Sequence, residues 1–478
     1  MACPGGALEN TIDNNTKLQT ITDPAAQRKL TLLLSTIIFF SVLNGTMFNV
    51  SLPDIAKQFS LLPSQVSWVV SGYIIIFAIG SVTYGRLADA YSVRNLITIG
   101  LVLFSAGSLI GFLSQWYPML IAARVVQAAG SGAIPALAML IATRYFPAEI
   151  RGRVLGIIAS TVAFGGGIGP VLGGFITGTF HWRYLFILSV MTLFTIPSFR
   201  RHLPGQARHD GGFDILGALL LAGAVGALLL FITLSLWWLL AVSSVFLAWF
   251  VAHIRRQPAP FVSPALFRDH RYRNTIIIAF LSVSTIFGMM FMTPLMLRGV
   301  NELGTGRIGL VMFPGAMGAA ILGTIGGKIV DKKGSIPVVY TGLALLISGF
   351  FFLSTTAGLS PWIIALNLII CYVGFAFLQS SLAHTVSSTL PKEHLGIGMG
   401  MYNLFFFMSG AFSAALIGKL LDLSKGHLPA NPLTATRSAG PYSNLFLLLS
   451  GIVLAAVCIF TFTFRGQAKK ASATKGRE

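Results

Sequence analysis

Fourteen apolar runs dominate this chain, and each is long enough to cross the hydrocarbon core of a bilayer as a helix. Twelve runs of about 18 to 25 residues lie at residues 29–51, 66–85, 95–114, 118–141, 153–178, 183–199, 274–297, 306–327, 336–357, 362–387, 397–421 and 443–464. Two more lie within 214–254, because about 40 uninterrupted apolar residues exceed one crossing and the chain must turn back near Ser235. Inside a bilayer no water is available to satisfy free backbone groups, so such runs have to be helices. The sequence therefore predicts an all-α integral membrane protein with 14 transmembrane helices.

The order of these runs predicts how the chain is divided. A polar tail, residues 1–28, precedes a six-helix bundle at 29–199, two linking helices at 214–254, a second six-helix bundle at 274–464 and a basic tail at 465–478. No small-residue cleavage pattern follows the first apolar run, so the first helix is expected to be retained rather than removed as a signal peptide.

Composition and charge agree with this assignment. Of 478 residues 55% are hydrophobic and 10% charged, with a mean hydropathy of +0.79, whereas soluble domains carry roughly 25% charged residues. If the amino terminus is cytoplasmic, about 25 of the 33 basic residues fall on the cytoplasmic side and about 7 outside. The net charge of +19 is then explained by membrane topology and by contact with anionic lipid, not by nucleic-acid binding. Both termini are predicted to be cytoplasmic, in a multi-pass protein of the cell membrane.

The segment GGGIGPVLGG, Gly165 to Gly174, is unusual inside an apolar run because it is rich in glycine and contains a proline. Glycine lets neighbouring membrane helices touch backbone to backbone, and neighbouring helices can satisfy the carbonyl that proline frees. The pattern GxxxGPxxGG resembles the antiporter motif of drug exporters in the major facilitator superfamily. Its residues are Gly165, Gly169, Pro170, Gly173 and Gly174. The alternative is a kinked, tightly packed helix without a transport role.

Two loops repeat a related pattern and suggest a duplicated transporter. GRLADAYSVR follows the second run and GGKIVDKKG follows the tenth, each with an aspartate and basic residues beyond a glycine. The first loop resembles the superfamily loop motif, carried here by Gly85, Arg86, Asp89 and Arg94. That resemblance implies a conformational latch, with Arg144 or Arg153 as the partner of Asp89.

Several polar residues within the runs are candidates for the lining of a central cavity. A buried arginine in a span is costly and indicates a partner or a task; LIAARVVQAAGSGA resembles a superfamily motif with such an arginine. The alternative for this arginine is a hydrogen-bonded anchor between helices. The predicted cavity and substrate residues are Asn44, Asn49, Trp68, Tyr73, Arg124 and Gln127.

Taken together, FFSVLNGTMFNVSLPDIAKQF, RYFPAEIRGRVLGIIAS, VMFPGAMGAAILGTIGGKIVDKKG and PYSNLFLLLSGI resemble the fourteen-helix drug/proton antiporters, and most closely their tetracycline efflux branch. The resemblance covers about residues 35–465. It implies the major facilitator fold and export of a drug, with tetracycline carried as a divalent-metal complex, in exchange for protons. Export of another amphipathic or cationic drug and a non-transporting sensor with the same fold stay open.

One departure bears on proton coupling. The tetracycline exporters carry acidic residues where this chain has Gly45 and Gly410, and no Asp or Glu lies near the middle of any run. The remaining candidates to carry the proton are Asp54, Asp331, Asp214 and His384, of which the histidine changes charge near neutral pH. For each of them a structural role is the alternative.

The sequence offers no support for an enzyme. It contains no catalytic constellation, no metal-ligand cluster and no GxxxxGK[ST] phosphate loop. Cys3, Cys371 and Cys458 are too scattered for a disulfide framework. We expect a small-molecule drug and protons as partners, no bound cofactor beyond the proton gradient as energy source, and a monomer, with dimerisation left open.

Overall fold

The computed structural model describes residues 21, 23–203, 214–257, 261–262, 264–391, 395–424 and 428–475. In these residues all regular secondary structure is helical, and 14 helical segments are long and apolar enough to cross a membrane. This confirms the predicted all-α membrane fold with 14 helices.

The first six spans form the N-terminal half. Three of them are broken by a short interruption or a 3-10 turn, so the half contains more helices than spans. The helices are α1 (Pro24–Phe59), α2 (Pro63–Val66), α3 (Trp68–Ala90), α4 (Val93–Phe112), α5 (Tyr117–Ser131), α6 (Ala133–Arg144), α7 (Ala148–Thr179), α8 (Leu185–Val190) and α9 (Ile196–His202). The 3-10 turns are η1 (Trp182–Tyr184) and η2 (Met191–Thr195).

Two linking helices, α10 (Ile215–Leu234) and α11 (Trp237–Ile254), precede the C-terminal half. That half consists of α12 (His270–Gly299), α13 (Thr305–Lys333), α14 (Ser335–Thr356), α15 (Pro361–Thr389), α16 (Leu395–Leu423) and α17 (Gly440–Lys475), with 3-10 turns at Pro264–Arg268 and Arg437–Ala439. Helix α17 continues past residue 464, where the last apolar run ends, and α1 begins at Pro24, within the segment predicted as a polar tail.

Local sequence accounts for several helix ends. The Asp23 carboxylate accepts hydrogen bonds from the amides of Ala25 and Ala26 at 3.0 and 3.2 Å, which satisfies backbone donors that the first turn leaves free. Ser235 has a left-handed backbone, φ 58°, between α10 and α11, at the turn that the sequence predicts. Gly334 ends α13 with φ 80°, a conformation that glycine adopts without steric cost.

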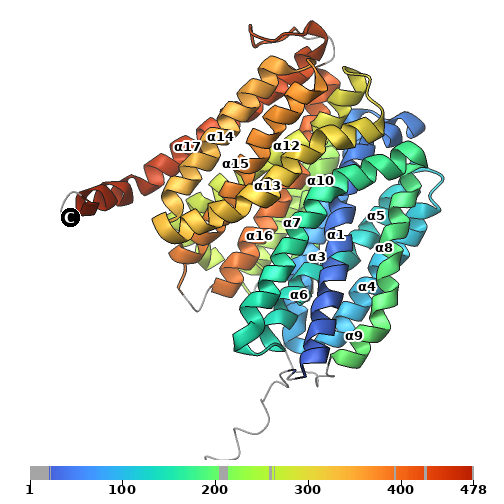
Figure 1. Cartoon of the computed structure of the whole chain (residues 1–478), viewed down its shortest axis with the longest axis vertical. Helices are drawn as coiled ribbons and strands as arrows, with labels where there is room; N and C mark the ends of the chain where they lie inside the picture. The colour runs from blue at the N-terminus through green and yellow to red at the C-terminus, as the bar shows by residue number, and fades with distance from the viewer. Residues whose placement is uncertain are drawn as a thin grey trace, which may run out of the picture.

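The two halves lie side by side, and α7 and α13 lie against each other between them (Figure 1). On the other side of the seam α3 packs against α16, and α10 contacts both of these helices. Trp68 of α3 donates to the Thr233 hydroxyl of α10 at 2.9 Å, and Lys419 of α16 lies 3.4 Å from the Thr233 carbonyl. The linking helices therefore join both halves along this seam.

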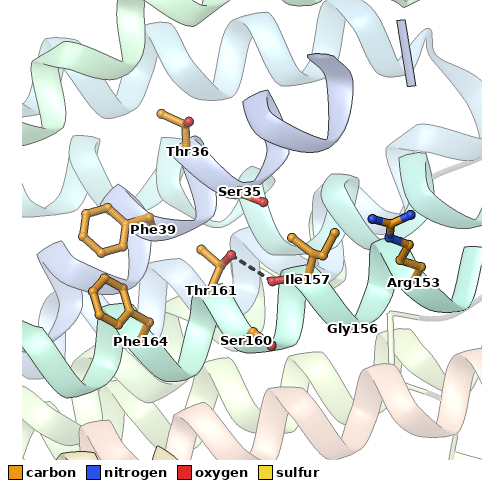
Figure 2. A pocket seen from close by; sticks show the side chains of 9 residues that line it. All are labelled: Ser35, Thr36, Phe39, Arg153, Gly156, Ile157, Ser160, Thr161 and Phe164. Carbon is orange, nitrogen blue, oxygen red and sulfur yellow. Dashed lines mark hydrogen bonds between the residues drawn. The ribbon is translucent and has the colours of Figure 1, made fainter. Parts of the chain in front are cut away.

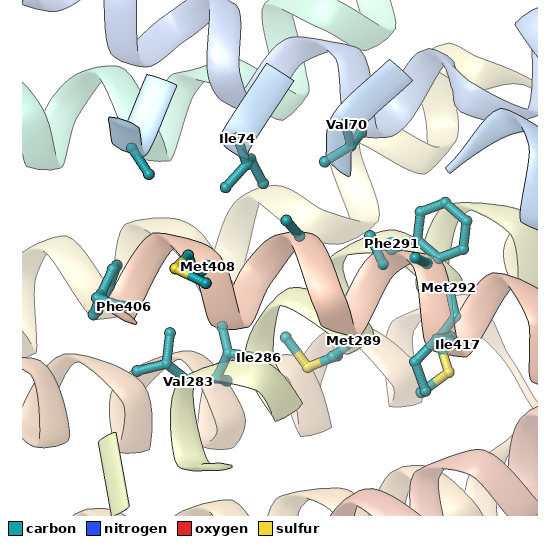
Figure 3. Close-up of a cluster of buried hydrophobic side chains, with 14 of the residues drawn as sticks. Val70, Ile74, Val283, Ile286, Met289, Phe291, Met292, Phe406, Met408 and Ile417 are labelled. Carbon is teal, nitrogen blue, oxygen red and sulfur yellow. The ribbon is translucent and has the colours of Figure 1, made fainter. Parts of the chain in front are cut away.

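The largest hydrophobic core crosses from one half to the other. Figure 3 shows α3 side chains such as Val70 and Ile74 opposite Met408 and Ile417 of α16 and Met289 of α12. A second core is confined to the N-terminal half and includes Leu34, Ile97 and Ile141. The centre of the molecule is thus filled by flexible methionine and aliphatic side chains, which tolerate repacking.

The ends of the helices define two faces. Since each span crosses once, the start of α1 and the ends of α6, α9 and α13 share one face, and these ends carry Arg144, Arg200, Arg201, Lys332 and Lys333. We call this the basic face and the other one the opposite face.

Candidate functional site

Helix α7 presents glycines to two different neighbours. Toward α1, a Cβ added at Gly173 would lie 2.7 Å from the Met47 carbonyl oxygen, and one at Gly169 would overlap the side chain of Thr46. Toward α13, a Cβ at Gly174 would lie 2.8 Å from the Thr305 carbonyl oxygen. Helix α7 can hold both contacts only because these positions lack side chains. The Gly165–Gly174 motif therefore joins the two halves by direct backbone packing.

These contacts close the opposite face and leave the basic face open. Near the opposite face, Gly418 of α16 approaches Pro63 so closely that an added Cβ would lie 2.8 Å from its carbonyl oxygen. Near the basic face, Gly152 of α7, Gly327 of α13 and Gly396 of α16 would meet nothing within 4 Å. The two halves are therefore in closer backbone contact at Gly174 and Gly418 near the opposite face than at these three glycines near the basic face.

The α7 face that touches α13 continues toward the basic face as the wall of a groove. Gly167, Gly174 and Gly178 contact α13, and at helical spacing the same row continues through Phe164, Ser160 and Ile157. Toward the basic face α13 no longer covers this row, and a shallow, open groove of about 680 Å³ lies between α1 and α7. Its lining residues are Ser35, Thr36, Phe39, Arg153, Gly156, Ile157, Ser160, Thr161 and Phe164.

The groove has an apolar and a charged end (Figure 2). Phe39 of α1 and Phe164 of α7 stack at one end, with ring centroids 5.8 Å apart and planes inclined by 23°. Arg153 lies at the other end, and the hydroxyls of Ser35, Ser160 and Thr161 lie between. The Thr161 hydroxyl donates to the Ile157 carbonyl at 2.8 Å. This arrangement suits an amphipathic molecule.

The predicted cavity residue Arg124 lies inside the N-terminal half instead of in this groove. Its side chain is 1% exposed, and its guanidinium group donates to the Val69 carbonyl at 3.0 Å and to the side-chain oxygens of Asn44 and Gln127 at 2.7 Å each. The Tyr73 ring covers it at 3.9 Å, and Phe48 lies 4.2 Å away on α1. All of these groups are neutral, so the described contacts of Arg124 include no carboxylate.

The other predicted cavity residues are also buried or occupied. Asn44 donates to Ser189 at 2.8 Å, Gln127 donates to Ser108 at 2.7 Å, and Asn49 is 5% exposed. The indole of Trp68 points to Thr233 of α10. The structure thus brings Asn44, Tyr73, Arg124 and Gln127 together, while their role toward a substrate stays a prediction.

Asp54 joins the two halves at the opposite face. Its Oδ1 accepts from the Arg298 guanidinium of α12 at 3.1 Å, and its Oδ2 accepts from the Thr305 hydroxyl of α13. Asp54 lies near the end of α1, so a single carboxylate holds two helices of the other half. Among the four predicted proton carriers, it is the one with described contacts across the seam between the halves.

Asp214 caps α10 and is largely buried, with 7% exposure. It accepts from the Gly217 amide at 2.8 Å and the Phe261 amide at 3.0 Å, and its Oδ1 lies 2.6 Å from His253 Nε2. Burial acts to raise the pKa of Asp214, but the hydrogen bonds from His253, Gly217 and Phe261 outweigh it and lower the pKa. Asp331 in the last turn of α13 and His384 in α15 are exposed.

The loop motif is only partly described. The Asp89 side chain lies outside the described residues, so its predicted partner is not defined. Arg144 donates to the Ala88 carbonyl at 3.0 Å, and Arg86 lies 3.5 Å from the Phe261 carbonyl. Arg86 and Asp214 therefore both contact the backbone of Phe261, Arg86 at its carbonyl and Asp214 at its amide.

The groove between α1 and α7 was not predicted from the sequence, which named only Arg153 of its residues, as a possible partner of Asp89. In the sequence, the α7 residues of the groove are marked only by their helical spacing from Gly167 and Gly174, which places them on the same face of the helix. Nothing in the sequence shows that α13 does not cover that face near the basic end. Among the residues that the structure describes, no group of three or more His, Cys, Asp or Glu side chains could hold a metal ion.

Comparison with known proteins gives one consistent result. The family model of the Major Facilitator Superfamily matches residues 34–415. The chain is 26% identical over 402 residues to the multidrug resistance protein Stp of Mycobacterium tuberculosis, covering 80% of this chain and 74% of Stp. It is 25% identical over 423 residues to the multidrug transporter MdtP of Bacillus subtilis, covering 85% and 78% of the two chains. It is 24% identical over 416 residues to the riboflavin transporter RibZ of Clostridioides difficile, covering 84% and 91%.

Solved structures agree at the level of the fold. A bacterial homologue of the human lysosomal transporter Spinster, in an inward-facing and unoccupied conformation, superposes with a TM-score of 0.68 at 15% identity, covering 93% of this chain and 98% of that one. A D-xylose–proton symporter superposes with a TM-score of 0.65 at 15% identity, covering 91% and 98%.

Proposed function

The chain belongs to the major facilitator superfamily and is a multi-pass membrane transporter, not an enzyme, and we propose that it exports drugs from the cytoplasm in exchange for protons. The observation that carries the proposal is the double packing of α7. Its glycines touch α1 on one side and α13 on the other, which closes the opposite face while a groove stays open at the basic face.

The proposed direction of transport depends on which of the two faces is cytoplasmic. We propose that the basic face is cytoplasmic, as the positive-inside rule favours, that both termini lie there, and that the protein works as a monomer in the cell membrane. A drug would then enter the groove from the cytoplasm or the inner leaflet. Closure of α13 over the groove, together with separation of α1 from α12 at the opposite face, would expose the drug to the outside.

Proton exchange is assigned to Asp54. Its carboxylate holds Arg298 and Thr305 of the other half, and protonation from the outside would remove the charge that binds the guanidinium. A charge-assisted hydrogen bond contributes about 1.5 to 3 kcal/mol, which is enough to change the balance of two states at least tenfold. Asp331, Asp214 and His384 are the next candidates, and Arg86, Asp89 and Arg94 are assigned to the latch near the basic face.

The range of drugs is expected to be broad. Stp and MdtP are named as multidrug proteins, and the core between the halves is rich in methionine, which can repack around different shapes. Tetracycline with a divalent cation is one substrate to test. A cationic complex would find no acidic side chain near the middle of any span, so tetracycline has less physical support than export itself.

Everted vesicles test this function directly. We expect vesicles that contain the protein to accumulate drug when the interior is acidified and to release it when a protonophore collapses the gradient. Asp54→Asn should lose this gradient-driven uptake, whereas Glu302→Gln, a matched change at an exposed carboxylate near the opposite face, should keep it. Uptake that requires ATP and ignores the protonophore would refute the proposal, and full coupling in Asp54→Asn would refute the assignment of the proton.

A further inference from the structure

The groove between α1 and α7 is built for one class of molecule. We infer that it binds an anionic amphiphile, a compound with a flat apolar body and a carboxylate or sulfonate at one end, as the substrate that the transporter collects. This inference rests on the proposed export function and narrows its substrate class.

The apolar end of the groove fits a flat ring system. Phe39 and Phe164 offer stacked aromatic faces, and Ile157 adds aliphatic surface along α7. Aromatic rings bind other flat rings through offset stacking. Between Phe164 and Arg153 the helix rises about 16 Å, so a molecule seated on the rings can direct a polar group toward the guanidinium. The hydroxyls in between can accept or donate hydrogen bonds along the way.

The charged residues in and near the groove favour an anionic ligand. Arg153 is the only charged residue that lines the groove, and it makes no hydrogen bond or ion pair with any described residue. The side chain of Asp89, one of whose predicted partners is Arg153, lies outside the described residues. Deeper in the same half, Arg124 is buried among neutral partners. No described Asp or Glu lines the groove beside Arg153, and none lies near the middle of any span to offset the charge of Arg124. A planar guanidinium pairs well with a carboxylate or sulfonate, whereas a cationic drug would be repelled at both positions.

The position of the groove fits a transported ligand better than a resident one. Ile157, Ser160 and Phe164 continue the α7 row that α13 covers near the opposite face. If the halves rock so that the basic face closes, α13 must cover this row, and a molecule in the groove has to leave or move on. A ligand bound here is therefore tied to one state of the cycle.

Three pyrene derivatives that differ only in their end group test the inference. Pyrenebutyrate is anionic, pyrenebutanol is neutral, and a pyrenebutyl trimethylammonium salt is cationic. Binding to the purified full-length protein would be followed by pyrene fluorescence, and transport by gradient-driven uptake into everted vesicles. We expect the anion to bind and be transported best.

Two substitutions separate the two ends of the groove. Arg153→Gln should weaken binding of the anion about fivefold, as for an exposed charge pair, and leave the neutral compound unchanged. Phe164→Ala should weaken all three compounds alike. The matched control is Arg151→Gln, which removes the same charge two residues away on α7 but does not line the groove, and it should leave binding of the anion unchanged.

Several outcomes would overturn the inference. One is better binding of the cation than of the anion. Another is an equal loss in Arg153→Gln and Arg151→Gln, since that would reflect general surface charge. If phosphatidylglycerol displaces pyrenebutyrate and no anion is transported, the groove is a lipid site. When the cation or the neutral compound is exported and the anion is not, the substrate class is wrong but the proposed export stands. Failure of every compound, tetracycline included, to move with the pH gradient would overturn the proposed function as well.

Discussion

A single methyl group at Gly174 should open the opposite face. The Cβ of an alanine there would lie 2.8 Å from the Thr305 carbonyl oxygen and 3.2 Å from the Gly309 Cα. Both atoms belong to the α13 backbone and cannot rotate away as a side chain can. The two helices must separate by several tenths of an ångström, and because they belong to different halves, the halves separate with them.

The expected shift between the two conformational states depends on which state contains the contact between Gly174 and α13. Overpacking of this kind costs about 1 to 3 kcal/mol. We expect the contact to be present only when the opposite face is closed, so the cost falls on that state alone. A differential of this size changes the ratio of the two states roughly 5- to 150-fold. The Gly174→Ala protein should therefore favour the state that is open at the opposite face.

Thiol labelling measures this ratio. In a background with Cys3, Cys371 and Cys458 replaced by alanine, Ser160→Cys places a reporter in the exposed groove. An impermeant maleimide should label it in everted vesicles, and Gly174→Ala should slow that labelling and impair export.

The matched control for this experiment is Gly152→Ala on the same helix. A Cβ there meets nothing within 4 Å, so labelling of the groove and export should both stay as in the parent protein. Unchanged labelling and export in Gly174→Ala would refute the role of the backbone contact, and so would an equal effect of Gly152→Ala.

Three further changes probe other parts of the molecule. Gly45→Asp should meet no steric clash at its Cβ, since nothing lies within 4 Å of that position. Its new carboxylate should raise vesicle uptake of a lipophilic cation such as tetraphenylphosphonium, and unchanged uptake by protein that reaches the membrane would contradict this. Gly410→Asp should lower the unfolding free energy by about 1 to 3 kcal/mol, because its Cβ would lie 2.8 Å from the Phe287 ring, and a melting curve in detergent equal to that of the parent would be evidence against it. Asp214→Asn should cost about 1.5 to 3 kcal/mol at neutral pH. The lowered pKa of Asp214 means that its contribution is complete above the ordinary value of 3.8 and is lost as the pH falls below it, so melting temperatures of the two proteins should converge in acid, and a constant difference would show that the charge is not involved.

The apolar pattern was enough to determine the architecture. Fourteen runs of membrane-crossing length left helices as the only solution, and the turn at Ser235 followed because the stretch around it is too long for one crossing. The same pattern could not place α3 as a helix separate from α2, or extend α17 to Lys475, because short interruptions and helical ends outside the bilayer carry no hydropathy signal. The glycine row of α7 was readable as a packing motif, since only glycine allows such close contact.

The contacts of the predicted functional residues, such as Arg124 and Asp54, were decided by the tertiary structure. The sequence singled out Arg124, Asn44, Gln127 and Tyr73 as cavity candidates but did not show that the other three enclose the guanidinium group. Asn44 and Tyr73 lie on other helices than Arg124, and the rotation of those helices is set by packing. The sequence ranked Asp54 as a candidate without showing that Arg298, 244 residues later, lies beside it. The groove itself exists because α13 leaves α7 toward the basic face, and the angle between two rigid halves is decided by contacts spread over the whole seam. A local pattern fixes which residues form helices, but long-range packing decides which side chains those helices bring together.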